Sequence, residues 1–330
     1  MGARLGVIAD DLTGACDTGL QFGKRGLRTV VLFDLPTAAS SEMAAHVTGA
    51  DVVAVDTDSR AAVVDLAYRR VRAAASGLAS LGIGRAYKKI DSTLRGNIGA
   101  EVEALLDETG ATVALVAPSF PANGRTVLGG RLFVNGKPLA ETDFALDPLW
   151  PARESHVPTL LAGQTRRRVG LIESAVVCAG EASIAAAVED GLRSGVEVFV
   201  LDAATADELA AIGRALAAHP EWVGVGSAGL AEHLPEALGL APAATDSSSP
   251  LSCPQRAKAG KGERSCASDT GRSLCPGANL TPFPFPSREG ESSSGWLGAR
   301  PAPAPSGGRW GRGSPGADPA STPAGEGESR

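Results

Sequence analysis

The stretch Thr112-Val113-Ala114-Leu115-Val116 is apolar after its first residue, and Val198-Phe199-Val200-Leu201 repeats the pattern later in the chain. Because neither stretch alternates apolar and polar residues, both predict strands that are buried on their two faces. Similar runs recur up to about residue 240, separated by alanine-rich amphipathic stretches. This alternation predicts an α/β fold, with a mostly parallel sheet flanked by helices in a Rossmann-like three-layer arrangement and right-handed crossovers.

The same pattern places the individual elements. Strands are expected over 4–9, 28–33, 51–56, 84–90, 112–117, 168–172, 196–201 and 222–226. Helices are expected over about 14–25, 60–80, 98–109, 180–193, 205–217 and 228–238. The segment from Arg125 to Leu139 breaks the rhythm, because Asn135-Gly136 lies between short apolar runs and favours a hairpin turn. It predicts a β-hairpin excursion beside the ligand-binding edge of the sheet.

Residues 1–240 and 241–330 differ sharply in composition. Nearly half of the second segment is Pro, Gly or Ser, and its large apolar residues are few and unperiodic. Such a segment buries too little surface to offset the entropy of ordering it, so we expect a folded domain followed by a disordered tail. Three origins of the tail stay open: a native disordered segment, a frameshift product translated past a gene interruption, and an RGG-type RNA-binding tail.

Bulk composition limits the function classes. The net charge of −6 argues against general nucleic-acid binding, and no apolar run approaches the roughly 18 residues of a membrane-spanning helix. The first residues read as a strand rather than a signal peptide, so we expect a soluble cytoplasmic protein. The five cysteines are scattered without a Cys-x-x-Cys pair, which argues against a disulfide framework or a zinc site.

Polar residues gather where the expected strands end, which is the edge of a parallel sheet at which ligands bind. Asp10 and Asp11 follow the first strand, and Thr13 is placed to N-cap the helix after it. The two carboxylates suit sugar hydroxyls or Mg²⁺ held through water. The alternative is that one aspartate caps the helix and the other is solvated.

The third strand is followed by Asp58, Ser59 and Arg60. Asp58 or Ser59 either caps the next helix or binds a ligand. An arginine so close to a helix N-terminus runs against the helix dipole, so we expect Arg60 to serve a bound anion.

The densest cluster runs from Tyr87 to Asn97 and combines two lysines, an aspartate, two hydroxyls, an arginine and an asparagine. Lys88 and Lys89 lie on a strand and therefore point to opposite faces of the sheet. Lys89, Asp91 and Arg95 suit a small anionic polar ligand, with Ser92 or Thr93 capping the next helix. An ion-pair network among Lys89, Asp91 and Arg95 is the structural alternative.

Two further loops complete the candidate site. Pro118 to Arg125 forms a stiff Pro-x-x-Pro loop that ends in Asn123-Gly124-Arg125, and Arg125 is expected to face the same edge as Arg95. Gly226 and Ser227 open a helix in a glycine-rich turn, which alone carries little information about phosphate binding. No Walker A lysine is present, and the first turn lacks Gly-x-Gly-x-x-Gly, which disfavours a Rossmann-type dehydrogenase.

Taken together, four of these motifs closely resemble the N-terminal sugar-binding domain of the four-carbon acid sugar kinase family, which includes kinases of threonate, erythronate and 3-oxo-tetronate. They are 9–15, 56–60, 88–97 and 118–130. The resemblance implies that Asp10, Asp11, Lys89, Asp91, Arg95, Asn97 and Arg125 line the substrate pocket. It also implies a separate C-terminal domain for ATP and Mg²⁺, which the sequence after about residue 245 does not resemble.

We therefore expect a truncated kinase of four-carbon sugar acids, or a non-catalytic module that binds them. Asp11 or Asp91 would orient or deprotonate the attacking hydroxyl. The expected substrate-binding residues are Asp10, Asp11, Asp58, Ser59, Arg60, Lys89, Ser92, Arg95, Asn97, Asn123 and Arg125, with Gly226 and Ser227 as cofactor candidates. The expected partner is a small anionic sugar acid, and loss of a domain would leave apolar surface near 222–240 that promotes a homo-oligomer.

Overall fold

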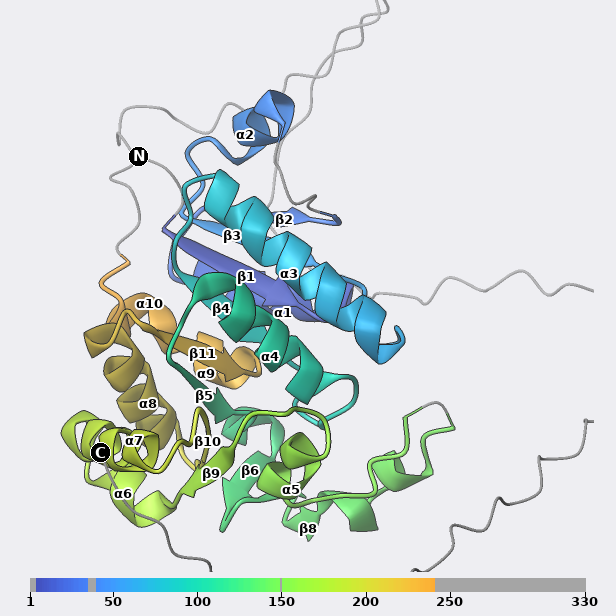
Figure 1. Cartoon of the computed structure of the whole chain (residues 1–330), viewed down its shortest axis with the longest axis vertical. Helices are drawn as coiled ribbons and strands as arrows, with labels where there is room; N and C mark the ends of the chain where they lie inside the picture. Colours follow the sequence, from blue (N-terminus) through green and yellow to red (C-terminus); the bar gives the residue numbers. More distant parts are fainter. Residues whose placement is uncertain (1–3, 35–39, 149, 241–330) are drawn as a thin grey trace, which may run out of the picture. The chain divides into compact units, whose positions relative to one another are not determined.

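Eight parallel strands form the central sheet in the order β2-β3-β1-β4-β11-β5-β10-β9 (Figure 1). They are β1 (Leu5–Ala9), β2 (Thr29–Leu32), β3 (Val52–Asp56), β4 (Ala86–Lys89), β5 (Val113–Ala117), β9 (Val169–Ile172), β10 (Val198–Leu201) and β11 (Trp222–Gly226). Each strand lies where the sequence predicts one, and the apolar runs of the inner strands β1, β3, β5, β10 and β11 are buried. The predicted α/β fold is confirmed.

The computed structural model describes residues 4–34, 40–148 and 150–240, which belong to one unit. The segment 241–330, for which the sequence predicts a disordered tail, lies outside the described residues. Within the described ranges no helix is long and apolar enough to cross a membrane. The two cysteines in these ranges, Cys16 and Cys178, are free thiols.

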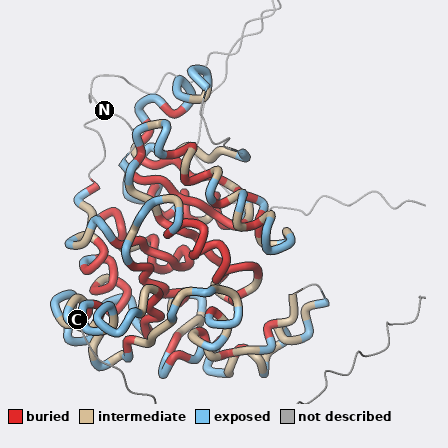
Figure 2. Tube along the Cα trace, viewed as in Figure 1, coloured by how far each residue is buried: buried red, intermediate tan, exposed pale blue. Residues whose placement is uncertain are grey.

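Helices cover both faces of the sheet, with α3 and α4 in front and α1 behind in the view of Figure 1. One face carries α1 (Leu12–Gly23), α6 (Ser174–Cys178), α7 (Glu181–Arg193), α8 (Ala206–Ala218), α9 (Ala228–Ala231) and α10 (Leu234–Ala237). The other carries α2 (Ser41–Val47), α3 (Val64–Ser80), α4 (Ile98–Thr109) and α5 (Val157–Ala162). Figure 2 shows that the strands between these two layers are buried.

Two predicted helices differ from the structure. The helix expected from residue 60 begins at Val64, after an extended Val63 that makes no side-chain cap. The helix expected over 228–238 is broken into α9 and α10, and Pro235 stands in the first turn of α10, where its missing amide hydrogen costs nothing. The short helices α2, α5 and α6 were not expected, because five to seven residues are too few to show a helical period.

The predicted β-excursion is confirmed as a three-stranded antiparallel sheet of β6 (Arg125–Leu128), β7 (Arg131–Val134) and β8 (Lys137–Pro138). Its two tight turns, Gly129-Gly130 and Asn135-Gly136, have positive φ at both central residues, as type I′ hairpins require. A bridge between Val127 and Ala203 joins the excursion to the end of β10. Three short 3₁₀ helices flank it at Pro121–Asn123, Leu139–Glu141 and Asp143–Leu146.

The order of the strands reverses between β1 and β4. β1 leads into α1 on one face of the sheet, whereas its neighbour β4 leads into α4 on the opposite face. The two connections therefore separate at the carboxyl ends of these strands, which is where open α/β sheets bind their ligands.

Candidate functional site

A cavity of about 290 Å³ opens at the carboxyl ends of β1, β4, β5 and β11. Its lining includes nine residues predicted from the sequence: Asp11, Arg60, Lys89, Asp91, Ser92, Arg95, Asn123, Arg125 and Ser227. It also includes five that were not predicted as ligands: Thr13, Gly14, Asp17, Phe120 and Ala228. The volume lies near the lower end of ligand pockets, roughly 300–1,000 Å³, and suits a small polar molecule.

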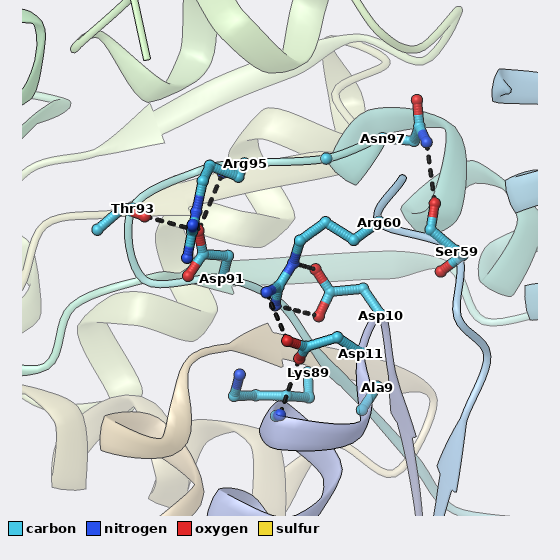
Figure 3. A network of polar contacts seen from close by, with 12 residues as sticks. Ala9, Asp10, Asp11, Ser59, Arg60, Lys89, Asp91, Thr93, Arg95 and Asn97 are labelled. Carbon is cyan, nitrogen blue, oxygen red and sulfur yellow. Dashed lines mark hydrogen bonds and ion pairs between the residues drawn. The ribbon is translucent and has the colours of Figure 1, made fainter. Parts of the chain in front are cut away.

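Arg60 is held in a fork by two consecutive aspartates (Figure 3). Its Nε and Nη2 donate to the two oxygens of Asp10 at 2.8 and 2.9 Å, and its Nη1 donates to Asp11 Oδ2 at 2.5 Å. Burial alone would lower the pKa of Arg60, but the hydrogen bond and charge of Asp10 reverse this and raise it. Arg60 therefore neutralises Asp10, which is only 1% exposed, and is less available to a ligand than the sequence suggested.

Asp11 caps α1, which confirms the alternative of an aspartate cap and corrects the placement of Thr13 as the cap, while Asp10 is buried rather than solvated. The Asp11 side chain accepts the Gly14 amide at 2.8 Å, so both of its oxygens are engaged once Arg60 is counted. A Cβ on Gly14 would lie 2.6 Å from Asp11 Oδ1 and 2.9 Å from Lys89 Nζ. A side chain at this position would therefore displace the Asp11 cap or the end of Lys89.

Asp91 follows β4 and lines the cavity. Its Oδ2 accepts Thr93 Oγ1 at 2.6 Å and Arg95 Nε at 2.5 Å, while Oδ1 accepts no hydrogen bond from the described residues. Burial opposes ionisation of Asp91, but the hydrogen bonds from Arg95 and Thr93 outweigh it and lower its pKa. Neither Ser92 nor Thr93 caps α4 as expected, since its N-cap residue is Asn97.

The two lysines of β4 face opposite sides of the sheet, as predicted. Lys88 is fully buried and pairs with Glu101 of α4 at 2.8 Å. Lys89 is 6% exposed, lines the cavity and forms no ion pair or side-chain hydrogen bond within the described part of the chain. Burial lowers the pKa of Lys89 against the opposing charges of Asp10, Asp91 and Asp11. The structural alternative of a Lys89–Asp91–Arg95 network is thus reduced to the Asp91–Arg95 pair.

Arg95 and Arg125 also line the cavity, and Figure 3 shows Arg95 apart from Lys89, beside Asp91. Arg95 Nη1 lies 3.8 Å from Asp147, and hydrogen bonding and charge from Asp91 raise the pKa of Arg95 despite its partial burial. Arg125 begins β6, and its Nη1 donates to the Asn123 carbonyl. The buried Nε of Arg125 has no hydrogen-bond partner among the described residues, and no carboxylate of those residues pairs with it.

Four predicted site residues near the cavity do not line it. Asp10 lies beneath Arg60, and Asp58 is exposed and pairs with Arg70 at 3.0 Å. Ser59 is buried and shares a hydrogen bond with Thr57 at 2.7 Å, so neither Asp58 nor Ser59 caps a helix. The amide of Asn97 donates to the carbonyls of Ser59 and Ala62 at 3.1 and 2.8 Å, which anchors the loop that carries Arg60.

The glycine-rich turn after β11 serves the packing of the loops. Gly226 does not line the cavity, and a Cβ there would lie 2.6 Å from the Ala117 carbonyl oxygen. The Ser227 hydroxyl donates to the Ser119 carbonyl at 2.8 Å and accepts the Gly229 amide at 3.0 Å. Ser227 and the following Ala228 line the cavity, so a role of this turn in binding a phosphate stays a prediction.

A resident metal site was not predicted, and no cluster of three or more His, Cys, Asp or Glu side chains suited to a metal occurs over the described ranges. Mg²⁺ delivered with a nucleotide needs only one or two protein carboxylates, so this observation does not bear on it.

Residues 5–234 match the model of a family described as the sugar-binding N-terminal domain. The chain belongs to this family. A D-threonate kinase from Cupriavidus necator is 41% identical over 233 residues, which make up 69% of this chain and 53% of the relative. A D-erythronate kinase from Heliobacterium modesticaldum is 39% identical over 204 residues, 62% of this chain and 46% of the relative. The sequence-based recognition of the four-carbon acid sugar kinases is confirmed, and the chain spans about half the length of the curated relatives it matches.

Solved structures of similar fold extend the comparison of this sugar-binding domain. A protein from Salmonella typhimurium LT2, described as a putative tRNA synthase, aligns with a TM-score of 0.66 at 32% identity, covering 72% of this chain and 56% of that one. A protein of unknown function from Bordetella bronchiseptica aligns with a TM-score of 0.61 at 34% identity, covering 71% and 56%. The Bordetella protein is described as a domain-swapped dimer with bound citrate.

Proposed function

We propose that residues 1–240 are the acid-sugar-binding domain of a kinase that phosphorylates a four-carbon sugar acid of the threonate, erythronate or 3-oxo-tetronate type. The observation that carries this proposal is the charge balance of the cavity. Lys89 and Arg125 both face it, and neither has a carboxylate partner within the described ranges. A buried cation without a partner is costly, so the cavity is built for an anion that arrives from outside.

The other polar groups of the cavity suit the hydroxyls of such an acid. Asp91 Oδ1 and Asp17 offer carboxylate oxygens, and Ser92 and Asn123 offer further hydrogen-bonding groups. The citrate described for the Bordetella structure is likewise a small hydroxy acid. These features support a ligand that carries both a carboxylate and hydroxyls, rather than a simple anion.

Asp91 is the better candidate of the two aspartates for orienting the attacking hydroxyl. Asp11 has both oxygens engaged by Gly14 and Arg60, whereas Asp91 keeps Oδ1 for the substrate. The lowered pKa of Asp91 keeps it ionised near neutral pH. A carboxylate of this kind accepts the hydroxyl proton as the nucleophile attacks and, above all, holds the hydroxyl in line.

Of the two nucleotide-binding candidates from the sequence, Gly226 packs against the Ala117 carbonyl, and Ser227 bonds Ser119 and Gly229 at the edge of the cavity. We propose that ATP and Mg²⁺ belong to the complete family enzyme, and that segment 241–330 stands in place of the nucleotide-binding domain. The chain alone would then bind the acid without phosphorylating it. A non-catalytic sugar-acid-binding module is the second candidate, and a homo-oligomer is proposed for either by analogy with the Bordetella dimer.

The test is calorimetric titration of the purified chain with D-erythronate and D-threonate, with erythritol as a neutral control of the same carbon skeleton. Binding of an acid without measurable binding of erythritol is the expected result. Failure of every acid tested to bind would overturn the proposal. A parallel titration with ATP-Mg²⁺ tests what the two candidates share, because each expects this chain to bind the acid and not the nucleotide.

A further inference from the structure

We propose that the substrate lies in the cavity with a fixed polarity: its carboxylate binds Lys89 at the first turn of α1, and the hydroxyl to be phosphorylated points toward Arg95 and Arg125. This inference rests on the proposed function and adds the direction of binding. It also revises the expectation from the sequence, in which the two arginines hold the carboxylate.

The part of the cavity that Lys89 lines suits an anionic group that takes no part in the reaction. Lys89 is 6% exposed and has no partner within the described ranges, although Asp11 and Asp91 lie close by. Each of those carboxylates is already bound by an arginine, Asp11 by Arg60 and Asp91 by Arg95. Lys89 is therefore the buried cation whose charge is left for a ligand.

The first turn of α1 reinforces this end of the cavity. Thr13 and Gly14 line it, and Lys89 Nζ lies 2.9 Å from the position that a Cβ on Gly14 would occupy. The N-terminus of this helix of 12 residues carries a partial positive charge, which stabilises a nearby anion. Because Asp11 already accepts the Gly14 amide at this helix end, Lys89 is the cation that remains there for a ligand carboxylate.

The arginine end is more open. The Arg95 side chain is 30% exposed and Arg125 is half-buried, whereas Lys89 is almost fully covered. The buried Nε of Arg125 lacks a partner among the described residues, so this guanidinium also has a donor to offer. Two separate cationic ends match a molecule with an anionic group at each end, such as a phosphorylated sugar acid.

Chemistry decides which anion takes which end. The carboxylate is unchanged by the reaction, so it can be buried without blocking the phosphoryl donor from the reacting hydroxyl. The phosphoryl group must come from a donor outside this domain, so it has to enter at the open end. Arginines placed there stabilise the charge that develops on the transferred group.

The experiment compares two probes, D-erythronate and 4-phospho-D-erythronate, whose phosphate and carboxylate lie at opposite ends of the molecule. Both are titrated into the full chain and into Lys89→Gln and Arg125→Gln. Arg131→Gln, which removes a charge from the exposed start of β7 outside the cavity, is the matched control. Thermal unfolding shows whether each variant is folded.

Lys89→Gln is expected to weaken both probes at least tenfold, with their relative affinity kept within threefold. Arg125→Gln is expected to lower the preference for the phosphorylated probe at least tenfold. The reverse pattern overturns the proposed polarity, and so does an equal loss of affinity for both probes in both variants. If Lys89→Gln does not fold, the ratio of the affinities of Arg125→Gln for the two probes decides alone. Failure of the unmodified chain to bind either probe would instead overturn the proposed function.

Discussion

Lys88 and Lys89 are consecutive residues of β4 with opposite electrostatic situations. Lys88 lies 2.8 Å from Glu101 in a pair that is closed to solvent, whereas Lys89 faces the cavity without a carboxylate partner in the described structure. The pleat of the strand sends one lysine to each face. Lys88 is therefore neutralised within the fold, and we propose that the charge of Lys89 serves a ligand.

Lys89→Met is expected to raise the stability of the free protein while abolishing acid binding. Removing a buried charge without a partner relieves its desolvation, which we expect to add about 1 kcal/mol to the free energy of unfolding. Urea unfolding measures the change, and titration with D-erythronate measures the loss of binding.

Lys88→Met is the matched comparison at the adjacent position. It leaves Glu101 buried without its counter-charge and should destabilise the protein by about 3–5 kcal/mol. If the two variants change stability in the same direction by similar amounts, the assignment of different roles to these lysines is wrong.

Gly14→Ala is expected to damage both the fold and the site. The added methyl would lie 2.6 Å from Asp11 Oδ1 and 2.9 Å from Lys89 Nζ, so we predict a loss of about 1–3 kcal/mol and weaker acid binding. Gly23→Ala, at the other end of α1, meets nothing within 4 Å and should be neutral or stabilise by about 0.5–1 kcal/mol. Thermal unfolding that ranks the two variants the other way would contradict the close packing at Gly14.

Glu208 is expected to contribute to the acid sensitivity of the fold. Burial raises its pKa, but hydrogen bonds from Ser174 Oγ, the Ala204 amide and the Thr205 hydroxyl outweigh this and lower the pKa to about 2. A depressed carboxyl pKa stabilises the folded state above the unfolded pKa of 4.5 and loses this effect as the pH falls toward 2.

Glu208→Gln should therefore cost on the order of 2 kcal/mol at pH 7 and progressively less below pH 4.5. Urea unfolding across this pH range measures the difference, with Glu189→Gln on the exposed side of α7 as the control. A penalty that stays constant with pH would show that ionised Glu208 is not the stabilising form.

Asp202 is expected to hold the β-excursion that carries Arg125. Its buried carboxylate accepts the amides of Gly129 and Gly130, both at 2.8 Å, and of Ser174 at 3.2 Å. Asp202→Ala would leave these amides unsatisfied, at a cost of about 2 kcal/mol. Hydrogen exchange at Gly129 and Gly130 should accelerate, and unchanged exchange at both would refute this role.

Much of the fold could be predicted from the sequence. A continuous apolar run such as Val198–Leu201 has no polar face to expose to water, so the strand that it forms is buried on both faces. The gathering of Asp11, Lys89 and Asp91 also followed, since parallel strands bring their carboxyl ends to one edge. Asp17 was missed although a signal existed: it follows Thr13 by four residues and so shares its face of α1.

The partners of each side chain could not be predicted. Arg60 and Asp10 are 50 residues apart, and their fork depends on β1 and β3 being neighbours, which no local pattern reveals. The cap of α1 was left open between Thr13 and an aspartate, because both residue types cap helices and only the extended backbone at Asp11 decides between them. Asn97 was expected in the pocket because the family resemblance implied it, and the sequence could not show that its amide instead holds the loop of Ser59 and Ala62.

The most direct test of the central claim is a crystal structure of the chain with D-erythronate. The account predicts the ligand in the cavity, with its carboxylate at hydrogen-bonding distance, about 3 Å, from Lys89 Nζ and a hydroxyl on Asp91 Oδ1. A ligand bound elsewhere on the domain, or no bound ligand at saturating concentration, would contradict it.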